Sequence, residues 1–328
     1  MVKDKIISVA PMMDWTDRHC RYFHRLIAPS ITLYTEMVTT GALLHGDTER
    51  FLRFDHKEKP VILQLGGSNP EELAKSAKMG EEAGYDEINL NCGCPSDRVQ
   101  SGMFGACLMA KPDLVADCIQ AMREAVSIPV SVKSRIGIDD APVDEMVDKF
   151  VSSVSRETNG LTNCNIFIIH ARKAWLKGLS PKENREIPPL QYDVVEDLKK
   201  NYLHLNIQLN GGIRSIEDIE KHLEIFDGVM IGRESYQNPW FLRGIQEKFY
   251  PKQDLLSPEQ IIDQMIEYAQ KQHELYETPL KAISRHMTGL FQGMPGARRW
   301  RQILSTDVHE TGVQPEILQK AYQEAFSP

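Results

Sequence analysis

The sequence lacks any run of ~18 apolar residues, the length that an α-helix needs to cross a membrane. Its opening segment, MVKDKIISVAPMMDW, has too short an apolar stretch for a secretory signal and soon turns polar. The six cysteines are scattered along 328 residues and do not form the dense framework of a small secreted protein. We therefore expect a protein of the reducing cytoplasm, with no membrane partner.

A net positive charge is also lacking. Acidic residues outnumber basic ones by 46 to 38, and the net charge of −8 argues against indiscriminate nucleic-acid binding. The charge is uneven, however, because no acidic residue occurs between Lys281 and Arg301. Such a segment is either a solvated helix face or a local surface that contacts phosphates, and the missing carboxylates favour the second interpretation.

Short β-branched runs alternate with helical stretches along most of the chain. We expect strands at residues 6–11, 31–37, 60–65, 86–91, 129–134, 165–170, 205–210 and 227–231. Helices are expected at residues 70–83, 112–126 and 142–156. Eight β-then-α units predict a (β/α)8 TIM barrel. The alternative, a doubly wound open sheet, usually carries a Gly-x-Gly-x-x-Gly loop after a strand, and this sequence has none.

The strand pattern stops near residue 245. The remaining sequence predicts helices at 258–277, 279–292, 295–304 and 315–326, separated by prolines. We therefore expect an α/β fold with two domains: a catalytic barrel over residues 1–245 and a smaller all-α helical domain over residues 246–328.

Catalytic and ligand-binding groups of TIM barrels lie at the C-terminal ends of the strands. Here these ends are Pro11-Met12-Met13, Glu36-Met37, Gln64-Leu65-Gly66, Asn89-Leu90-Asn91, Lys133-Ser134-Arg135, His170-Ala171-Arg172, Asn210-Gly211-Gly212 and Gly232-Arg233. A purely structural protein would have little reason to gather so many polar groups at one rim. The rim is therefore the candidate site.

The last two strands end in Asn210-Gly211-Gly212 and Gly232-Arg233. Small residues let backbone N–H groups approach a phosphate, and Arg233 would add positive charge. Glycine also closes many strands for conformational reasons, but the two glycine-bearing ends together favour a phosphate site.

Two rim residues remain ambiguous from the residues alone. Lys133 is compatible with an interior ion pair, a Schiff-base lysine, or a cation that faces the electron-rich edge of a flavin. His170 is compatible with a core histidine or with a hydrogen-bond donor to a bound cofactor.

Cys92 and Cys94 lie one residue apart where the fourth expected strand meets a loop. Side chains alternate along a strand, so Asn89 and Asn91 should point into the barrel mouth while Cys92 packs outward. Cys94 follows a glycine beyond the strand end, which places its thiol on the rim. Two cysteines supply only half of a tetrahedral zinc site, and a disulfide between them would be strained. We expect no metal.

Several longer segments are distinctive: APMMDWTDRHCRYF, YTEMVTTGAL, LQLGGSNPEELAKSAK, YDEINLNCGCPSDRVQSGMFGACLM, VKSRIGIDD, FIIHARKAWLKGLSPKENREIPPL, and NGGIRS followed by DGVMIGRESYQNPW. Together they resemble the tRNA-dihydrouridine synthases, and within that family the bacterial A subfamily. The likeness extends to the C-terminal segment GARRWRQIL and so covers nearly the whole chain.

This resemblance implies an FMN-binding barrel, a helical tRNA-binding domain and NADPH as the reductant. The family reduces the C5–C6 double bond of uridines in the tRNA D-loop, at positions 20 and 20a for the A subfamily. Carried over by motif, the FMN contacts would be Pro11, Met12, Met13, Gln64, Lys133, His170, Asn210, Gly211, Gly212, Gly232 and Arg233. Cys94 would be the catalytic acid and Asn91 would contact the substrate base. The tRNA contacts would include Lys182, Arg185, Arg298 and Arg301.

A thiol suits the acid step of this reaction. Hydride from flavin N5 adds to C6 of the uracil, and a proton must then reach C5 from the opposite face. A thiol with an ordinary pKa of ~8.5 stays protonated at neutral pH and can donate that proton.

Two alternatives stay open at this stage. One is a flavin-dependent barrel enzyme for a free small molecule such as a dihydropyrimidine, which the basic segment near the C-terminus opposes. The other is an RNA chaperone without catalytic activity, which the intact Cys94, Asn91 and Lys133 oppose. No obligate protein partner is evident in either case.

Overall fold

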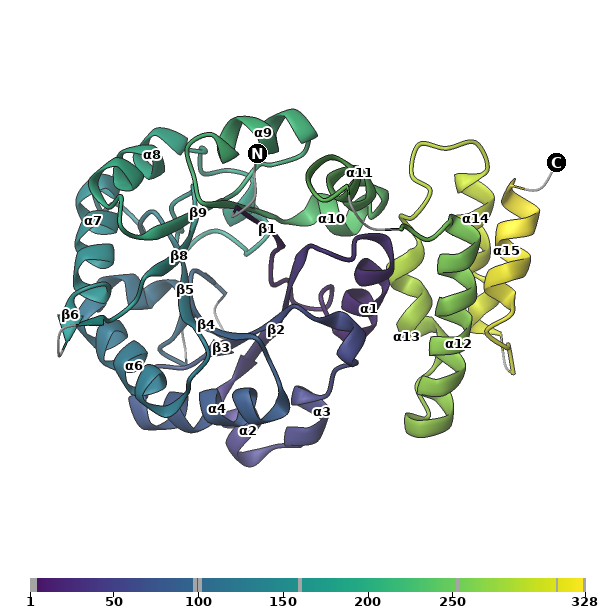
Figure 1. The fold of residues 1–328 in the computed structure, drawn as a ribbon, viewed down its shortest axis with the longest axis horizontal. Helices are drawn as coiled ribbons and strands as arrows, with labels where there is room; N and C mark the ends of the chain where they lie inside the picture. The colour runs from purple at the N-terminus through teal and green to yellow at the C-terminus, as the bar shows by residue number, and fades with distance from the viewer. Residues whose placement is uncertain are drawn as a thin grey trace. The chain divides into compact units, whose positions relative to one another are not determined.

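The computed structural model describes residues 5–96, 99, 102–158, 161–251, 254–310 and 312–326. Eight parallel strands of this part of the chain close into a barrel in the order β1-β10-β9-β8-β5-β4-β3-β2 (Figure 1). They are β1 (Ile6–Val9), β2 (Thr32–Thr39), β3 (Val61–Gly66), β4 (Glu87–Cys92), β5 (Val130–Arg135), β8 (Ile166–His170), β9 (Asn206–Asn210) and β10 (Gly228–Ile231). The predicted TIM barrel is confirmed, and every strand ends within two residues of its expected range.

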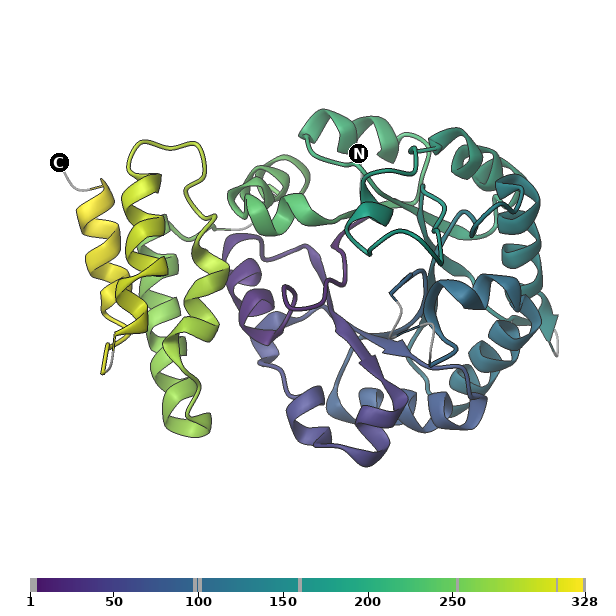
Figure 2. The same ribbon diagram turned by 180° about the vertical axis from the view of Figure 1, so that it is seen from behind.

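Helices cover the outside of the barrel in both views (Figures 1 and 2). They are α2 (Thr40–His45), α3 (Thr48–Leu52), α4 (Pro70–Ala83), α6 (Pro112–Ala125), α7 (Val143–Val154), α8 (Tyr192–Asn201) and α9 (Ile216–Leu223), with the 3-10 turns η2 (Gly105–Ala110) and η3 (Glu183–Arg185). The main apolar core lies between these helices and the strands. A smaller cluster inside the barrel contains Ala10, Tyr34, Ile62, Ile168 and Met230. The barrel interior is therefore filled by side chains, as in other TIM barrels.

Helix α4 shows how local sequence signals set an element's ends. The Asn69 side chain accepts hydrogen bonds from the backbone N–H groups of the first turn, and Pro70 occupies the first position. Gly84 ends the helix in a left-handed conformation with φ of 96°. The observed bounds of α4 equal the predicted ones.

A hairpin of two short strands was not predicted. Its strands are β6 (Glu157–Thr158) and β7 (Leu161–Thr162), and two residues carry no periodic pattern.

The chain divides into two compact units. The first comprises Met1–Met13, Thr32–Phe54 and Lys59–Gly232, and the second comprises Asp14–Ile31, Asp55–Glu58 and Arg233–Pro328. The second unit contains α1 (Arg18–Ile27), η1 (His56–Glu58), α10 (Arg233–Gln237), α11 (Trp240–Phe249), α12 (Pro258–Tyr276), α13 (Leu280–Ser284), η4 (Arg285–Met287), α14 (Ala297–Ser305), η5 (Asp307–His309) and α15 (Ile317–Phe326). This division is more interleaved than the single boundary expected between residues 245 and 246.

Contacts within the second unit explain why early residues belong to it. The rings of Tyr22 in α1 and Tyr268 in α12 stack with their centroids 4.0 Å apart. Arg21 Nε lies 2.7 Å from Glu58 Oε2, and both side chains are buried. Because each of these contacts joins segments far apart in the sequence, no local pattern could have predicted them. Among the described residues, no helix is both long and apolar enough to span a membrane.

Candidate active site at the barrel rim

Strand β4 separates its side chains as the sequence predicts. The Asn89 amide bonds to Gln64 and Ser131 of the neighbouring strands inside the barrel. Cys92 is fully buried in the outer core, where burial raises the pKa of its thiol well above the usual value. Cys92 therefore acts as a small apolar core residue.

The Asn91 side chain holds the loop that carries Cys94. Asn91 Oδ1 accepts hydrogen bonds from the backbone N–H of Gly93 at 3.2 Å and of Cys94 at 3.0 Å. Asn91 Nδ2 donates to Gln64 Oε1 at 2.8 Å. These bonds use both amide oxygen lone pairs and one N–H of Asn91, so its other N–H has no partner in the described part of the chain and is available to a ligand.

Further bonds continue from Gln64 towards the opposite end of the barrel. Gln64 Nε2 donates to Asn89 Oδ1 at 2.8 Å, and Asn89 Nδ2 donates to Ser131 Oγ at 2.8 Å. The Ser131 hydroxyl then donates to the Glu87 carboxylate. We call Asn91, Gln64, Asn89, Ser131 and Glu87 the hydrogen-bond chain. Every donor in it points the same way, so the Glu87 carboxylate is the final acceptor.

Cys94 itself is partly exposed. Its Sγ donates to Ser96 Oγ at 3.5 Å, and its carbonyl oxygen accepts the Ala106 N–H at 2.9 Å. The thiol is therefore accessible while its backbone is fixed from two sides.

Lys133 lies beside Asn91 in the register of β4 and β5. Its Nζ donates to Asn210 Oδ1 at 3.0 Å, and Asn210 Nδ2 donates to the Met230 carbonyl at 2.7 Å. Burial, with the nearby Arg135, lowers the pKa of Lys133 to about 7. Among the described residues its partner is an amide and not a carboxylate.

His170 and the glycines that end β9 pack closely together. Burial, with the positive charge of Arg135, lowers the pKa of His170 well below its usual value, so the ring is neutral. A Cβ on Gly211 would lie 3.0 Å from the His170 ring, and Gly211 has a φ of 116°. A Cβ on Gly212 would lie 2.5 Å from both Leu190 and Tyr192. Only glycine fits at either position.

Gly232 at the end of β10 differs from these two glycines. A Cβ built there would meet no atom within 4 Å, so its side faces open space. Of the other expected rim residues, Pro11 and Met12 are partly buried and Met12 packs against the interior cluster, whereas Met13 is 55% exposed. Arg233 begins α10 and belongs to the second unit.

Arg135 was expected at the rim, but sequence reasoning assigned it no role. Its buried guanidinium donates to the carbonyl oxygens of Gly93 at 3.2 Å and Asn184 at 2.8 Å. It thereby ties the Cys94 loop to the segment that follows β8. Burial lowers its pKa to about 10. The available signal was strand parity, since Arg135 shares a face of β5 with Lys133.

The expected tRNA-binding residues form two exposed pairs in different units. Lys182 and Arg185 lie at η3 in the first unit, where the Arg185 N–H bonds to the Lys182 carbonyl at 3.0 Å. Arg298 and Arg301 are three residues apart on α14 in the second unit and share a helix face.

Other residues of the basic segment have structural roles. Arg299 forms an ion pair with Glu324, and Trp300 is fully buried and donates to the Met287 carbonyl at 2.9 Å. Arg285 lies 2.6 Å from Asp17. The sequence alone did not separate these residues from Arg298 and Arg301.

In the described part of the chain, the His, Cys, Asp and Glu side chains form no group of three or more that could hold a metal ion. None of the six cysteines forms a disulfide bond in the structure.

These features define a TIM-barrel protein with a polar binding site. Its rim carries an accessible thiol on a fixed backbone, a partly buried lysine and several amide side chains. The family model described as "Dihydrouridine synthase (Dus)" matches residues 8–327. The chain belongs to the dihydrouridine synthase family.

Two relatives with the name "tRNA-dihydrouridine(20/20a) synthase" illustrate the similarity. The protein from Vibrio vulnificus (strain CMCP6) is 56% identical over 318 residues, which cover 96% of this chain and 95% of the relative. The protein from Escherichia coli (strain K12) is 55% identical over 316 residues, covering 96% and 90%.

A solved structure also resembles this fold. It is a 2-naphthoyl-CoA reductase in complex with 2-naphthoyl-CoA, with a TM-score of 0.53 and 11% sequence identity. The match covers 74% of this chain, and the chain spans half of that protein's length. At this identity the likeness concerns the fold alone.

Proposed function

We propose that the protein reduces the C5–C6 double bond of uridines at positions 20 and 20a of the tRNA D-loop, with FMN as the cofactor and NADPH as the reductant. The names of relatives that match almost the full chain at 55–56% identity support this substrate. The observation that carries the proposal is the placement of Cys94, an accessible thiol whose loop is held by Asn91 on the rim of a family barrel.

The rim residues fit a flavin mononucleotide. Gly232 leaves open space at the end of β10. Gly211 and Gly212 are required by packing against His170, Leu190 and Tyr192. The Lys133 ammonium has an amide partner and so remains available to an anionic or electron-rich group. Pro11, Met12, Met13, Gln64, His170, Asn210 and Arg233 would complete the contacts. When bound, FMN supplies the hydride.

Cys94 supplies the proton in this proposal. The proton moves from its Sγ to C5 of the uracil, and the thiolate that remains takes up a proton from water. Asn91 keeps the backbone of Cys94 fixed through its Oδ1 and directs its remaining N–H towards the base. Gln64 fixes the Asn91 amide in turn, so the donor side cannot rotate away.

Exposed basic residues would bind the phosphates of the tRNA. The four expected residues are exposed: Lys182, Arg185, Arg298 and Arg301. When such cationic side chains bind the phosphates of a nucleic acid, they displace the counterions held there, which favours binding. With tRNA as the substrate, we expect the protein to act in the cytoplasm. We expect no obligate protein partner.

Two measurements test this function. The purified protein should carry non-covalent FMN and, with NADPH, form dihydrouridine at positions 20 and 20a of unmodified tRNA. A deletion strain should lose dihydrouridine at these positions and regain it on complementation. A colourless protein that binds no FMN on titration, or a deletion strain with unchanged dihydrouridine, would refute the proposal. Turnover of a free pyrimidine but not of tRNA would instead favour a small-molecule enzyme.

A further inference from the structure

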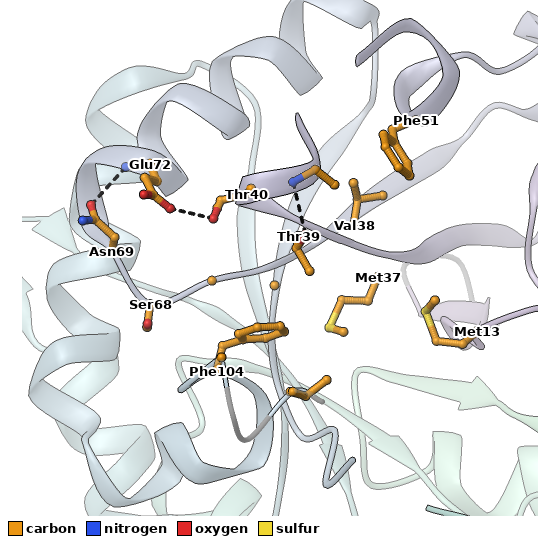
Figure 3. A pocket seen from close by; sticks show the side chains of 16 residues that line it. Met13, Met37, Val38, Thr39, Thr40, Phe51, Ser68, Asn69, Glu72 and Phe104 are labelled. Atoms are coloured by element: carbon orange, nitrogen blue, oxygen red, sulfur yellow. Dashed lines mark hydrogen bonds between the residues drawn. The ribbon is translucent and has the colours of Figure 1, made fainter. Parts of the chain in front are cut away.

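A hollow lies on the rim of the first unit, beside the expected flavin contact Met13. This pocket of about 760 Å³ is bounded by the ends of β2 and β3, the start of α4 and the ring of Phe104 (Figure 3). Met13 is the expected FMN contact that also lines it. The pocket therefore adjoins the proposed reaction site without coinciding with it.

One wall of the pocket consists of sulfur and aromatic side chains. A Cβ on Gly66 would lie 2.9 Å from both Met37 Sδ and Phe104 Cε2, so these two side chains close over the end of β3. Met13 and Phe51 extend this wall and are 55% and 39% exposed. Exposed groups of this kind suit a flat ring, because thioethers and aromatic rings pack well on π-systems.

The opposite end of the pocket is polar and acidic. Thr40 Oγ1 donates to Glu72 Oε2 at 2.8 Å (Figure 3). Glu72 Oε1 has no hydrogen-bond partner among the described residues. The described lining contains no Lys, Arg or His. A phosphate would be repelled by the Glu72 carboxylate, and no cationic side chain of the described lining would offset that repulsion, whereas a ring N–H would meet an available acceptor. The Glu72 end of the pocket thus favours a neutral ring with an N–H donor.

The pocket is also connected to the thiol loop. Phe104 precedes Gly105 and Ala106, and the Ala106 N–H bonds to the Cys94 carbonyl at 2.9 Å. Gly66 lies two residues beyond Gln64 on β3. The segment that carries Phe104 is therefore bonded to the loop that carries Cys94.

We propose that this pocket receives the nucleobase adjacent to the target uridine in the RNA chain. The inference rests on the proposed function, in which two consecutive positions are substrates. When one nucleotide occupies the reaction site, its neighbour must be accommodated one step along the strand. Phe104 and Met37 stack on that base, and Glu72 Oε1 accepts its ring or amino N–H. The diphosphate of the reductant does not fit, because of the Glu72 charge.

A double-mutant cycle tests this assignment. Flavin-loaded Phe104→Leu and Glu72→Ala are compared with wild type on intact tRNA and on tRNAs made abasic at either neighbour of the target. On intact tRNA each variant should lose about 10-fold in kcat/KM, the effect of one stacked or hydrogen-bonded base. On the tRNA that lacks the bound base, wild type and variants should be equal. Glu71→Ala removes an exposed carboxylate from the same helix turn outside the pocket, and it should match wild type on every RNA.

The outcomes separate the possible errors. Equal losses on intact and abasic RNAs would show a merely structural role, and no loss on either would show that the pocket is unused. Slower reduction of the flavin by NADPH without tRNA would assign the pocket to the reductant. Each of these results overturns the inference while the enzyme still makes dihydrouridine. A wild-type protein that makes none would instead refute the proposed function, and this inference with it.

Discussion

Asn91 Oδ1 lies 3.0 Å from the backbone nitrogen of Cys94. The last inward-facing residue of β4 thus fixes the first turn of the loop that follows it. Cys92, between them, faces the opposite way into the outer core. Two thiols so close in sequence therefore meet different surroundings.

We predict that alanine replacements at the two cysteines have different effects. Cys94→Ala should still bind FMN and be reduced by NADPH, but dihydrouridine formation should fall by ~10²–10⁴-fold, as expected for a lost general acid. Cys92→Ala should retain turnover and lose about 1 kcal/mol of stability through poorer packing. Stopped-flow flavin reduction, tRNA turnover and urea unfolding measure these effects. An equal loss of turnover in both variants would contradict the assignment.

The hydrogen-bond chain predicts a distant effect of Glu87. Glu87→Gln retains an acceptor for Ser131 and should keep the chain's direction and most of the turnover. Glu87→Ala removes the final acceptor, so kcat should fall while FMN binding is retained. Single-turnover rates on tRNA compare the two variants. If Glu87→Ala turns over tRNA as fast as Glu87→Gln does, the hydrogen-bond chain does not position the residues at the rim.

Glu87 should also make stability depend on pH. Burial raises its pKa from 4.5 to about 7. The folded state therefore binds this proton more tightly than the unfolded state does, and the stability that Glu87 contributes is lost as pH rises from about 4.5 to 7. Glutamine does not titrate, so Glu87→Gln should gain stability relative to wild type between pH 5 and pH 8. Urea unfolding at both pH values measures the difference, and a constant difference would contradict the prediction.

We predict that Arg298 and Arg301 bind tRNA through phosphates. Replacing both by Ala should weaken tRNA binding and reduce the slope of log K against log salt by about 1 for each lost contact. Flavin reduction by NADPH should not change. Arg299→Ala is the matched control, because that guanidinium is already paired with Glu324 on the same surface. A salt slope that changes as much in the control as in the double variant would argue against specific contacts.

The buried pair of Arg21 and Glu58 predicts a stability effect within the second unit. Glu58→Gln leaves the Arg21 guanidinium buried without its carboxylate and should cost about 3–5 kcal/mol. Adding Arg21→Met should recover much of that loss, since the unpaired charge is then gone. Equilibrium unfolding of the single and double variants measures the coupling. A double variant as unstable as the single one would show that the pair itself supplies the stability.

The sequence predicted those parts of the structure that depend on local periodicity. Alternation along β4 assigned Asn91 and Cys92 to opposite faces, and the β/α repeat assigned the barrel. Register between strands was not predictable, because it depends on how two strands and their connection pack together and not on the alternation within one strand. The pairing of Gln64 with Asn89, and of Asn91 with Lys133, therefore emerged only from the structure.

Contacts between distant segments also could not be predicted from the sequence. Arg135 and Asn184 meet through a side chain and a carbonyl oxygen 49 residues apart. Arg285 lies within the basic segment of the sequence, but its guanidinium forms an ion pair with Asp17. Tertiary contacts of this kind decide which charged residues remain available for a ligand.

The composition of the second unit has a consequence for synthesis on the ribosome. His19 of α1 hydrogen-bonds Tyr268, which is added 249 residues later, and Asp17 binds Arg285 and His286 later still. At ~5–20 residues per second, α1 emerges roughly 10–50 s before these partners are made. During that interval the native partners of His19 and Asp17 are missing, and we expect chaperones to bind this segment. A nascent chain that stops before α12 would expose this early segment to proteases.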